Sequence, residues 1–155
     1  NGVEYFFTNE EEYRKFREAG KIIEERVYDT YYGLWKYFMV DDGRIDLNHK
    51  NYGIIGTLEA YNNLRSFFGK ERVVPVLIEV DDGLRLQRAL DREKAQDFPK
   101  YEEMCRRYLA DCGDFSEEKV AAAEIGIRFL NEDLEKCIEE IKHYIAALLR
   151  EGNTR

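Results

Sequence analysis

Ile22-Ile-Glu-Glu-Arg-Val-Tyr-Asp-Thr-Tyr-Tyr-Gly-Leu-Trp-Lys-Tyr-Phe-Met-Val40 is the stretch around which the chain is organised. Aromatic and β-branched residues dominate it, and Gly33 lies at the expected bend, so it predicts short strands joined by tight turns. Its rings surround one acidic pair, Glu24 and Glu25. Rings, hydroxyls and a carboxylate together suit a planar polar ligand. An amphipathic hairpin whose aromatic residues fill a core explains the same pattern, and pattern alone favours that second interpretation.

Length and composition narrow the class of protein. The 155 residues fit one domain, and the net charge of −8 argues against broad binding to nucleic acid or to an anionic membrane. No apolar run reaches the length of a membrane span. Three cysteines, Cys105, Cys112 and Cys137, have no metal-type spacing, so we expect reduced thiols in a cytoplasmic protein and no metal site.

The first residues predict a strand over 3–8, followed by a helix. Thr8 and Glu11 have the spacing of a capping box at the start of that helix. Gly20 is placed to end it. Because the chain enters an apolar strand almost at once and without Met, we expect it to be the middle of a longer protein.

Apolar runs over 52–57, 73–80 and 127–130 predict three strands that alternate with helices, and hence βαβ units with a parallel sheet. The helices are expected from Leu58 to Gly69, over 83–96, over 100–111, from Ser116 to Gly126, and from a cap at Asn131 onward. Three parallel strands are few for this many helices, so a further strand is expected in front of residue 1.

Five arginines lie between residues 85 and 107. Arg85, Arg88 and Arg92 share one face of the helix expected over 83–96, and Arg106 and Arg107 follow on the next helix. A cluster of guanidinium groups fits phosphate oxygens, which predicts an anion site. A solvated helix face whose arginines pair with neighbouring acids is the alternative.

Several short motifs occur in a characteristic order. They are Gly2-Val3-Glu4-Tyr5-Phe6-Phe7, Glu24, Tyr32-Gly33, Arg88-x-x-x-Arg92, Arg107 and Phe129-Leu130-Asn131-Glu132-Asp133-Leu134. In this order the chain resembles the guanylate kinase family over about residues 2–145.

The resemblance implies an α/β fold with a three-layer parallel-sheet nucleotide-kinase core that is incomplete at its N-terminus. It implies one domain over 1–155. Its expected parts are a small mixed-β monophosphate-binding subdomain over 3–42, core segments over 43–82 and 112–155, and lid helices over 83–111.

The resemblance also implies a reaction, the transfer of a phosphoryl group from ATP, with Mg²⁺, to GMP in purine nucleotide metabolism. Tyr5 and Tyr32 would hold the phosphate of GMP, and Glu24 would accept hydrogen bonds from guanine. Gly33 and Glu59 would complete the substrate site. The expected partners are small-molecule nucleotides, without nucleic acid or membrane.

Four residues of the second half receive roles from the same resemblance. Arg88 and Arg92 would lie on the lid over ATP, and Arg107 would reach the transferred and acceptor phosphates. Asn131 would lie where the chain passes the adenine. Arginines on a mobile lid would neutralise the moving group only when the lid is closed.

Three departures from the family pattern are visible. The chain contains no Gly-x-x-x-x-Gly-Lys-Ser/Thr loop, so we expect roughly a quarter of the enzyme to precede residue 1. Leu34 stands where the family has Ser or Thr. Gly56-Thr57-Leu58-Glu59 stands where the family has Asp-Ile-Asp, with Glu59 as a nearby substitute.

Two other functions fit the same residues. One is a catalytically inactive guanylate-kinase-like module that binds phosphorylated partners. The other is a purely structural α/β domain. The sequence does not indicate an oligomeric state.

Overall fold

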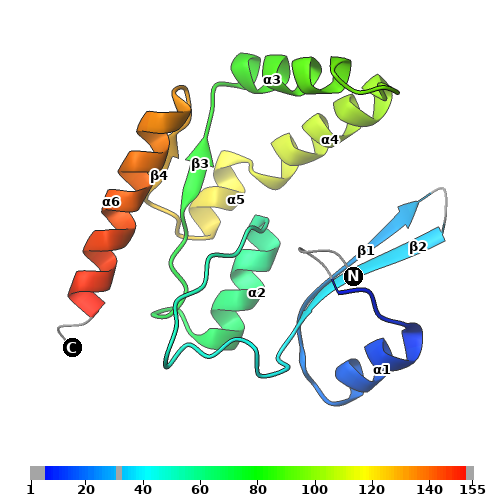
Figure 1. Cartoon of the computed structure of the whole chain (residues 1–155), viewed down its shortest axis with the longest axis vertical. Helices are drawn as coiled ribbons and strands as arrows, with labels where there is room; N and C mark the ends of the chain where they lie inside the picture. The colour runs from blue at the N-terminus through cyan, green and yellow to red at the C-terminus, as the bar shows by residue number, and fades with distance from the viewer. Residues whose placement is uncertain (1–5, 31–32, 153–155) are drawn as a thin grey trace. The chain divides into compact units, whose positions relative to one another are not determined.

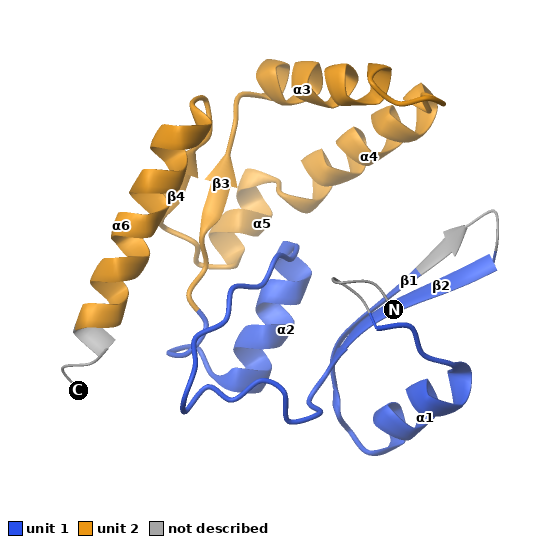
Figure 2. Ribbon diagram, viewed as in Figure 1, with its two compact units in different colours: residues 1–73 blue, residues 74–155 orange. Residues whose placement is uncertain are grey.

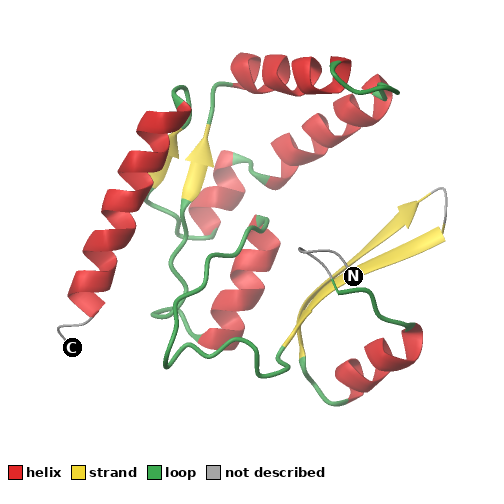
Figure 3. Ribbon diagram, viewed as in Figure 1, coloured by secondary structure: helices red, strands yellow, loops and turns green. Residues whose placement is uncertain are grey.

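The computed structural model describes residues 6–30 and 33–152, and the chain forms two compact units, residues 1–73 and 74–155 (Figure 2). Each unit contains helices and one small sheet (Figures 1 and 3). Both sheets have two strands among the described residues. The mixed α/β class is therefore confirmed, whereas the three-layer parallel core stays a prediction.

The sheet of the first unit is an antiparallel hairpin of β1 (Ile22–Thr30) and β2 (Gly33–Val40). The register pairs Ile22 with Val40 and Thr30 with Gly33, with one irregularity near the start of β1. Gly33 has a φ of 101°, a backbone conformation that residues with a Cβ rarely adopt. The predicted strands and the glycine between them are confirmed.

Helix α1 (Glu10–Glu18) begins one residue later than the capping box predicted. Asn9 is the N-cap, and its side-chain oxygen accepts a hydrogen bond from the backbone N–H of Glu12 at 2.9 Å. Thr8 donates instead to the Glu12 carboxylate. The predicted cap at Thr8 is wrong because Asn9 offers the same kind of acceptor immediately before the first turn.

The end of α1 is as predicted. Gly20 has a φ of 64°, and its N–H donates to the carbonyl of Arg17 at 3.0 Å. The N–H of Lys21 donates to the carbonyl of Phe16 at 2.9 Å. These two bonds form a Schellman motif, which turns the chain from the helix into β1.

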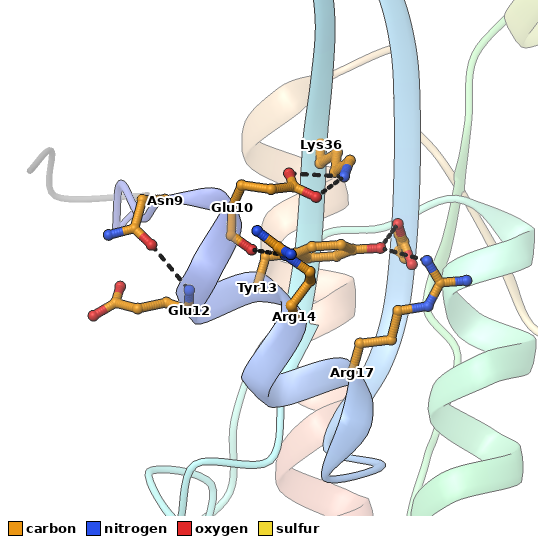
Figure 4. A network of polar contacts seen from close by, with 8 residues as sticks. Asn9, Glu10, Glu12, Tyr13, Arg14, Arg17 and Lys36 are labelled. Carbon is orange, nitrogen blue, oxygen red and sulfur yellow. Dashed lines mark hydrogen bonds and ion pairs between the residues drawn. The ribbon is translucent and has the colours of Figure 1, made fainter.

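Helix α1 packs on one face of the hairpin through Tyr13, which is only 3% exposed. The Tyr13 ring meets the edge of Phe38 at a centroid distance of 5.2 Å, and the Lys36 ammonium lies 4.1 Å from the Tyr13 centroid. The hydroxyl group of Tyr13 donates to Glu25, and Arg17 donates to that hydroxyl at 3.2 Å (Figure 4). The ring therefore fixes α1 against both strands.

Residues 6–8 form no strand, so the strand predicted over 3–8 is wrong for this part, and residues 3–5 lie outside the described residues. Phe6 and Phe7 are largely exposed. The Arg44 guanidinium lies 4.2 Å from the ring centroid of Phe6. The two sheets among the described residues are β1 with β2 and β3 with β4, and neither includes this segment.

The run 52–57 is also not a strand, which corrects the prediction of three parallel strands. Ile55 is fully exposed, and Thr57 already serves as the N-cap of α2 (Leu58–Phe68). The helix ends at Gly69, as predicted. A short apolar run cannot be distinguished from the lead-in to a helix by its pattern alone.

In the second unit, β3 (Leu77–Glu79) and β4 (Arg128–Leu130) pair in parallel, with Ile78 opposite Phe129. The parallel pairing is confirmed. The predicted strand over 73–80 is shorter than expected. Pro75 has no N–H to donate to a ladder, and the strand begins two residues after it.

The second unit also contains four helices among its described residues. They are α3 (Asp82–Lys94), α4 (Tyr101–Asp114), α5 (Glu117–Ala122) and α6 (Leu134–Gly152). Phe129 packs against Tyr144 of α6 at a centroid distance of 5.6 Å, and Val120 of α5 is 2% exposed. The core of the unit therefore lies between β4, α5 and α6.

The cap of α6 differs from the prediction. The carboxylate of Asp133 accepts from the N–H of Lys136 at 3.0 Å, so Asp133 and not Asn131 is the cap. Asn131 still belongs to the sheet, because its N–H donates to the carbonyl of Glu79 at 2.7 Å. That bond holds Asn131 two residues too early to cap the helix.

The Schellman motif gives a first test. Gly20→Ala places a Cβ in the left-handed region and should lower the free energy of unfolding by about 1–2 kcal/mol, measured by urea denaturation. Gly53→Ala is the matched control in the same unit, because Gly53 has no positive φ and a Cβ there meets nothing within 4 Å. Equal stability of the two variants would contradict the motif.

Candidate functional site

The site residues expected from the sequence fall in both units. Glu24, Gly33 and Glu59 belong to the first unit. Arg88, Arg92, Arg107 and Asn131 belong to the second unit. Tyr5 and Tyr32 lie outside the described residues.

Strand alternation separates the acidic pair of the hairpin. Glu25 lies opposite Phe38, on the face that α1 covers, and accepts the hydrogen bond of Tyr13. This hydrogen bond is the largest cause of a raised pKa at Tyr13, followed by burial. Glu24 lies on the other face. The carboxylate of Glu25 is thus part of the packing of α1.

Glu24 is held by an arginine that the sequence analysis missed. The Nε of Arg26 donates to Oε1 of Glu24 at 2.6 Å, and the Glu24 side chain is 12% exposed. Arg26 also donates through Nη2 to the hydroxyl of Thr57, the N-cap of α2. The spacing Glu-x-Arg, which places both side chains on one face of a strand, was the available signal.

The first turn of α2 lies beside this pair. Arg26 reaches Thr57, and the exposed Glu59 follows two residues later. Gly56 precedes the cap, and a Cβ at Gly56 would lie 3.0 Å from the Cβ of Ala60. A larger side chain at residue 56 therefore requires α2 to shift, which explains the glycine locally.

The aromatic residues of the hairpin also divide between the two faces. Phe38 packs against α1, whereas Trp35 and Tyr37 are 46% and 37% exposed. The rings of Trp35 and Tyr37 lie 6.4 Å apart with an interplanar angle of 32°. The interpretation that these aromatic residues simply fill a core therefore holds for Phe38 and not for Trp35 or Tyr37.

In the second unit, the structure brings Arg88 and Asn131 together. Nη1 of Arg88 donates to the carbonyl of Asn131 at 2.8 Å, and Nη2 donates to the carbonyl of Glu132 at 2.9 Å. Arg88 therefore lies at the carboxyl end of β4. The Oδ1 atom of Asn131 is buried and has no hydrogen-bond partner among the residues that the structure describes.

Arg107 is held on its own helix. Its Nε donates to Oε1 of Glu103 at 2.8 Å, and Arg106 binds the same carboxylate through Nε at 2.7 Å and Nη2 at 2.8 Å. These hydrogen bonds, that from Arg106 first, lower the pKa of Glu103 to about 2. Arg92 lies exposed in the last turn of α3. The structure thus places Arg107 with Glu103 and Arg106, and Arg88 with Asn131.

Helices α3 and α4 are joined by Arg85, which the sequence grouped with Arg88 and Arg92 as a candidate anion-binding arginine. Its guanidinium lies 4.3 Å from the ring centroid of Tyr108 and donates to the sulfur of Cys112 at 2.8 Å. It also pairs with Asp82 at 3.0 Å. Arg85 is thus a packing residue between the two helices.

The first unit also has a hollow that none of the expected site residues lines. This open hollow of about 290 Å³ is lined by Gly43, Ile45, Asp46, Leu47, Asn48, Phe68 and Arg72. Within residues 6–30 and 33–152, no group of three or more His, Cys, Asp or Glu side chains could hold a metal ion.

Comparison with curated proteins finds a guanylate kinase of Porphyromonas gingivalis that is 27% identical over 152 residues, which are 96% of this chain and 74% of that protein. The chain therefore resembles guanylate kinase, as the sequence indicated, and the similarity supports a kinase-like protein. No family model matches the chain, and no solved structure matches it. Among the described helices, none has both the length and the apolar character to cross a membrane.

The pairing of Glu103 with Arg106 and Arg107 on α4 predicts that the stability of this helix depends on pH. Because the pKa of Glu103 in the folded chain is about 2, below the ordinary 4.5, the pairing stabilises α4 above pH 4.5 and is lost as the pH falls toward 2. Replacing both Arg106 and Arg107 by Gln should return the midpoint of Glu103 toward 4.5. Carboxyl carbon shifts in an NMR titration measure this midpoint.

Glu117 is the control for this titration, because its lowered pKa depends on Arg128. Its midpoint should not move in the double variant. A wild-type midpoint of Glu103 near 4.5 would contradict the pairing.

Proposed function

We propose that the protein is an ATP-dependent nucleoside-monophosphate kinase whose acceptor is GMP. The observation that carries this proposal is the similarity to a guanylate kinase along 96% of the chain. The placement of Glu24 supports it, since this carboxylate lies on the hairpin face that α1 leaves uncovered. The motifs that gave the original resemblance are spread over both units.

The first unit would bind the acceptor nucleotide. Oxygen atoms of Glu24 would accept hydrogen bonds from the N1 and N2 hydrogens of guanine, and Arg26 would orient the carboxylate through its contact at 2.6 Å. Tyr5 and Tyr32 would donate their hydroxyls to the phosphate. Phosphoryl transfer depends on holding two nucleotides in line, so a fixed acceptor site is the main contribution of this unit.

The second unit would supply positive charge to the phosphates. Arg88 now donates to two neutral backbone carbonyls, at 2.8 Å and 2.9 Å. Hydrogen bonds from a guanidinium to phosphate are stronger than those to a neutral carbonyl, so phosphate can draw Arg88 away from Asn131 and Glu132. Arg92 and Arg107 are exposed and would join it at the transferred group.

ATP and Mg²⁺ differ in how well the described residues fit them. The buried Oδ1 of Asn131 has no partner among these residues, so it suits an amino-group donor such as that of adenine. Mg²⁺ finds no carboxylate cluster there. Mg²⁺ would therefore arrive with the phosphates of ATP, where it neutralises charge, and we assign no Mg²⁺ ligand to this chain.

A second candidate is a module that binds phosphorylated partners without catalysis. Gly56, which stands where the resembled family has an aspartate, favours it, because a side chain there would approach Ala60 to 3.0 Å. The same arginines would then bind a phosphate group without transferring it. Binding of a phosphopeptide by a protein that lacks turnover would select this function.

The kinase proposal is tested by following ADP formation in the protein as encoded, with each nucleoside monophosphate in turn. GMP should be the best acceptor. Glu24→Gln should raise the KM for GMP about 10- to 100-fold, because it weakens hydrogen bonds to a charged group. Arg107→Gln should lower kcat by about 100-fold or more while changing KM little.

Glu25→Gln is the matched control, because Glu25 is the neighbouring acid on the opposite face and its amide can still accept the Tyr13 hydroxyl. It should leave both constants unchanged. Absence of turnover with every monophosphate rejects the kinase. Equal effects of Glu24→Gln and Glu25→Gln would reject the assigned role of Glu24.

A further inference from the structure

The hairpin face that carries Glu24 also carries two large aromatic side chains to which no role has been assigned. Arg26 lies directly opposite Tyr37 in the antiparallel register, and directly opposite residues share a face. Trp35 lies on the same face, because it precedes Tyr37 by two residues in β2. Glu24, Arg26, Tyr37 and Trp35 therefore lie on one surface, called here the Glu24 face.

The packing of α1 on the hairpin uses Phe38, on the other face. Helix α1 packs on the opposite face, where Phe38 meets Tyr13 and Phe16 at centroid distances of 5.2 Å and 6.4 Å. Trp35 keeps 46% of its surface exposed and Tyr37 keeps 37%. Neighbouring exposed aromatic residues with polar groups beside them are typical of a binding surface.

The polar part of the Glu24 face consists of a carboxylate and a guanidinium, which can form hydrogen bonds with the edge of a base. The carboxylate of Glu24 accepts hydrogen bonds and the guanidinium of Arg26 donates them, and the two groups lie 2.6 Å apart. An acceptor and a donor side by side match a planar ring whose edge carries both kinds of group. Rings on the same surface then contact the flat side of such a ligand.

We propose that Trp35 and Tyr37 form the stacking surface for the purine base of the acceptor nucleotide, while Glu24 and Arg26 bind the polar edge of that base. This inference rests on the proposed kinase function and names two further substrate-binding residues for it. The rings of Trp35 and Tyr37, called here the aromatic strip, lie 6.4 Å apart and are inclined by 32°. Stacking on aromatic side chains is tolerant of base identity, so discrimination between bases would come from Glu24 and Arg26.

Trp35 is the only tryptophan of the chain, so its fluorescence reports on this surface directly. GMP added to the whole protein should change the Trp35 emission in a saturable way. Ribose 5-phosphate, which has a phosphate and no base, should leave it unchanged. Calorimetry on the same samples gives an affinity that does not depend on the fluorescence.

Variants separate stacking from a general effect on the hairpin. Trp35→Ala should weaken GMP binding about 5- to 100-fold, and Trp35→Phe should restore much of the affinity. Val27→Ala is the matched control, because Val27 is exposed and lies next to Arg26 in β1 on the opposite face. Circular dichroism confirms that each variant is folded.

Each outcome supports or overturns the inference. If GMP binds wild type and Trp35→Ala equally and leaves the emission unchanged, the stacking surface is rejected while the kinase proposal stands. If no nucleotide binds, both are rejected. Emission that depends on protein concentration without nucleotide would assign the aromatic strip to a second copy of the chain and overturn the inference.

Discussion

The alternation of side chains along β1 and β2 is the constraint on which the first unit depends. Successive residues of a strand point to opposite faces, so Glu24 and Glu25 cannot share a surface. Tyr13 determines which of them is used in packing, because its ring meets Phe38 and its hydroxyl binds Glu25. The covered face holds α1, and the other face keeps Glu24 and Arg26 beside two exposed rings.

The arginines of the second unit also fall into two groups, those that link helices and strands and those that an anion could bind. Arg85 and Arg128 are structural. Arg85 lies between α3 and α4, and Arg128 binds Glu79 at 2.8 Å and Glu117 at 2.8 Å, which links β3, β4 and α5. Within the described part of the chain, Arg88 binds two neutral carbonyls, and Arg107 is an exposed member of a surface pair. Arginines held by neutral or solvent-screened partners are the ones that an anion can recruit at little cost.

Local signals in the sequence predicted the elements whose causes are local. Gly20 and Gly69 end helices, and the glycine-bearing hairpin and the parallel pairing of β3 with β4 follow from short patterns. Two of the errors have different causes, the first local and the second tertiary. The run 52–57 is not a strand because it leads into the cap at Thr57, and Asn131 does not cap α6 because it is bonded to Glu79.

The candidate site shows the same limit. The ordered set of motifs identifies Glu24. The spacing Glu-x-Arg puts Arg26 on the same strand face, but the second partner of Arg26, Thr57, is 31 residues away in the sequence. A bond between two such distant residues has no periodic signature. The division of Trp35 and Phe38 between two faces was readable from alternation, but which face is covered depends on the position of α1.

The contact from Arg26 to Thr57 has a consequence for how the Glu24 face works. One guanidinium binds the Glu24 carboxylate through Nε and the N-cap hydroxyl of α2 through Nη2. Thr57 also accepts from the N–H of Ala60 at 3.5 Å, so its hydroxyl serves the helix and the arginine together. The position of Glu24 is therefore tied to the start of α2. A ligand that displaces Arg26 from Glu24 would also disturb this cap. A ligand that binds Glu24 and Arg26 as an intact pair would leave α2 in place. The proposed base edge, which uses both side chains together, meets this condition.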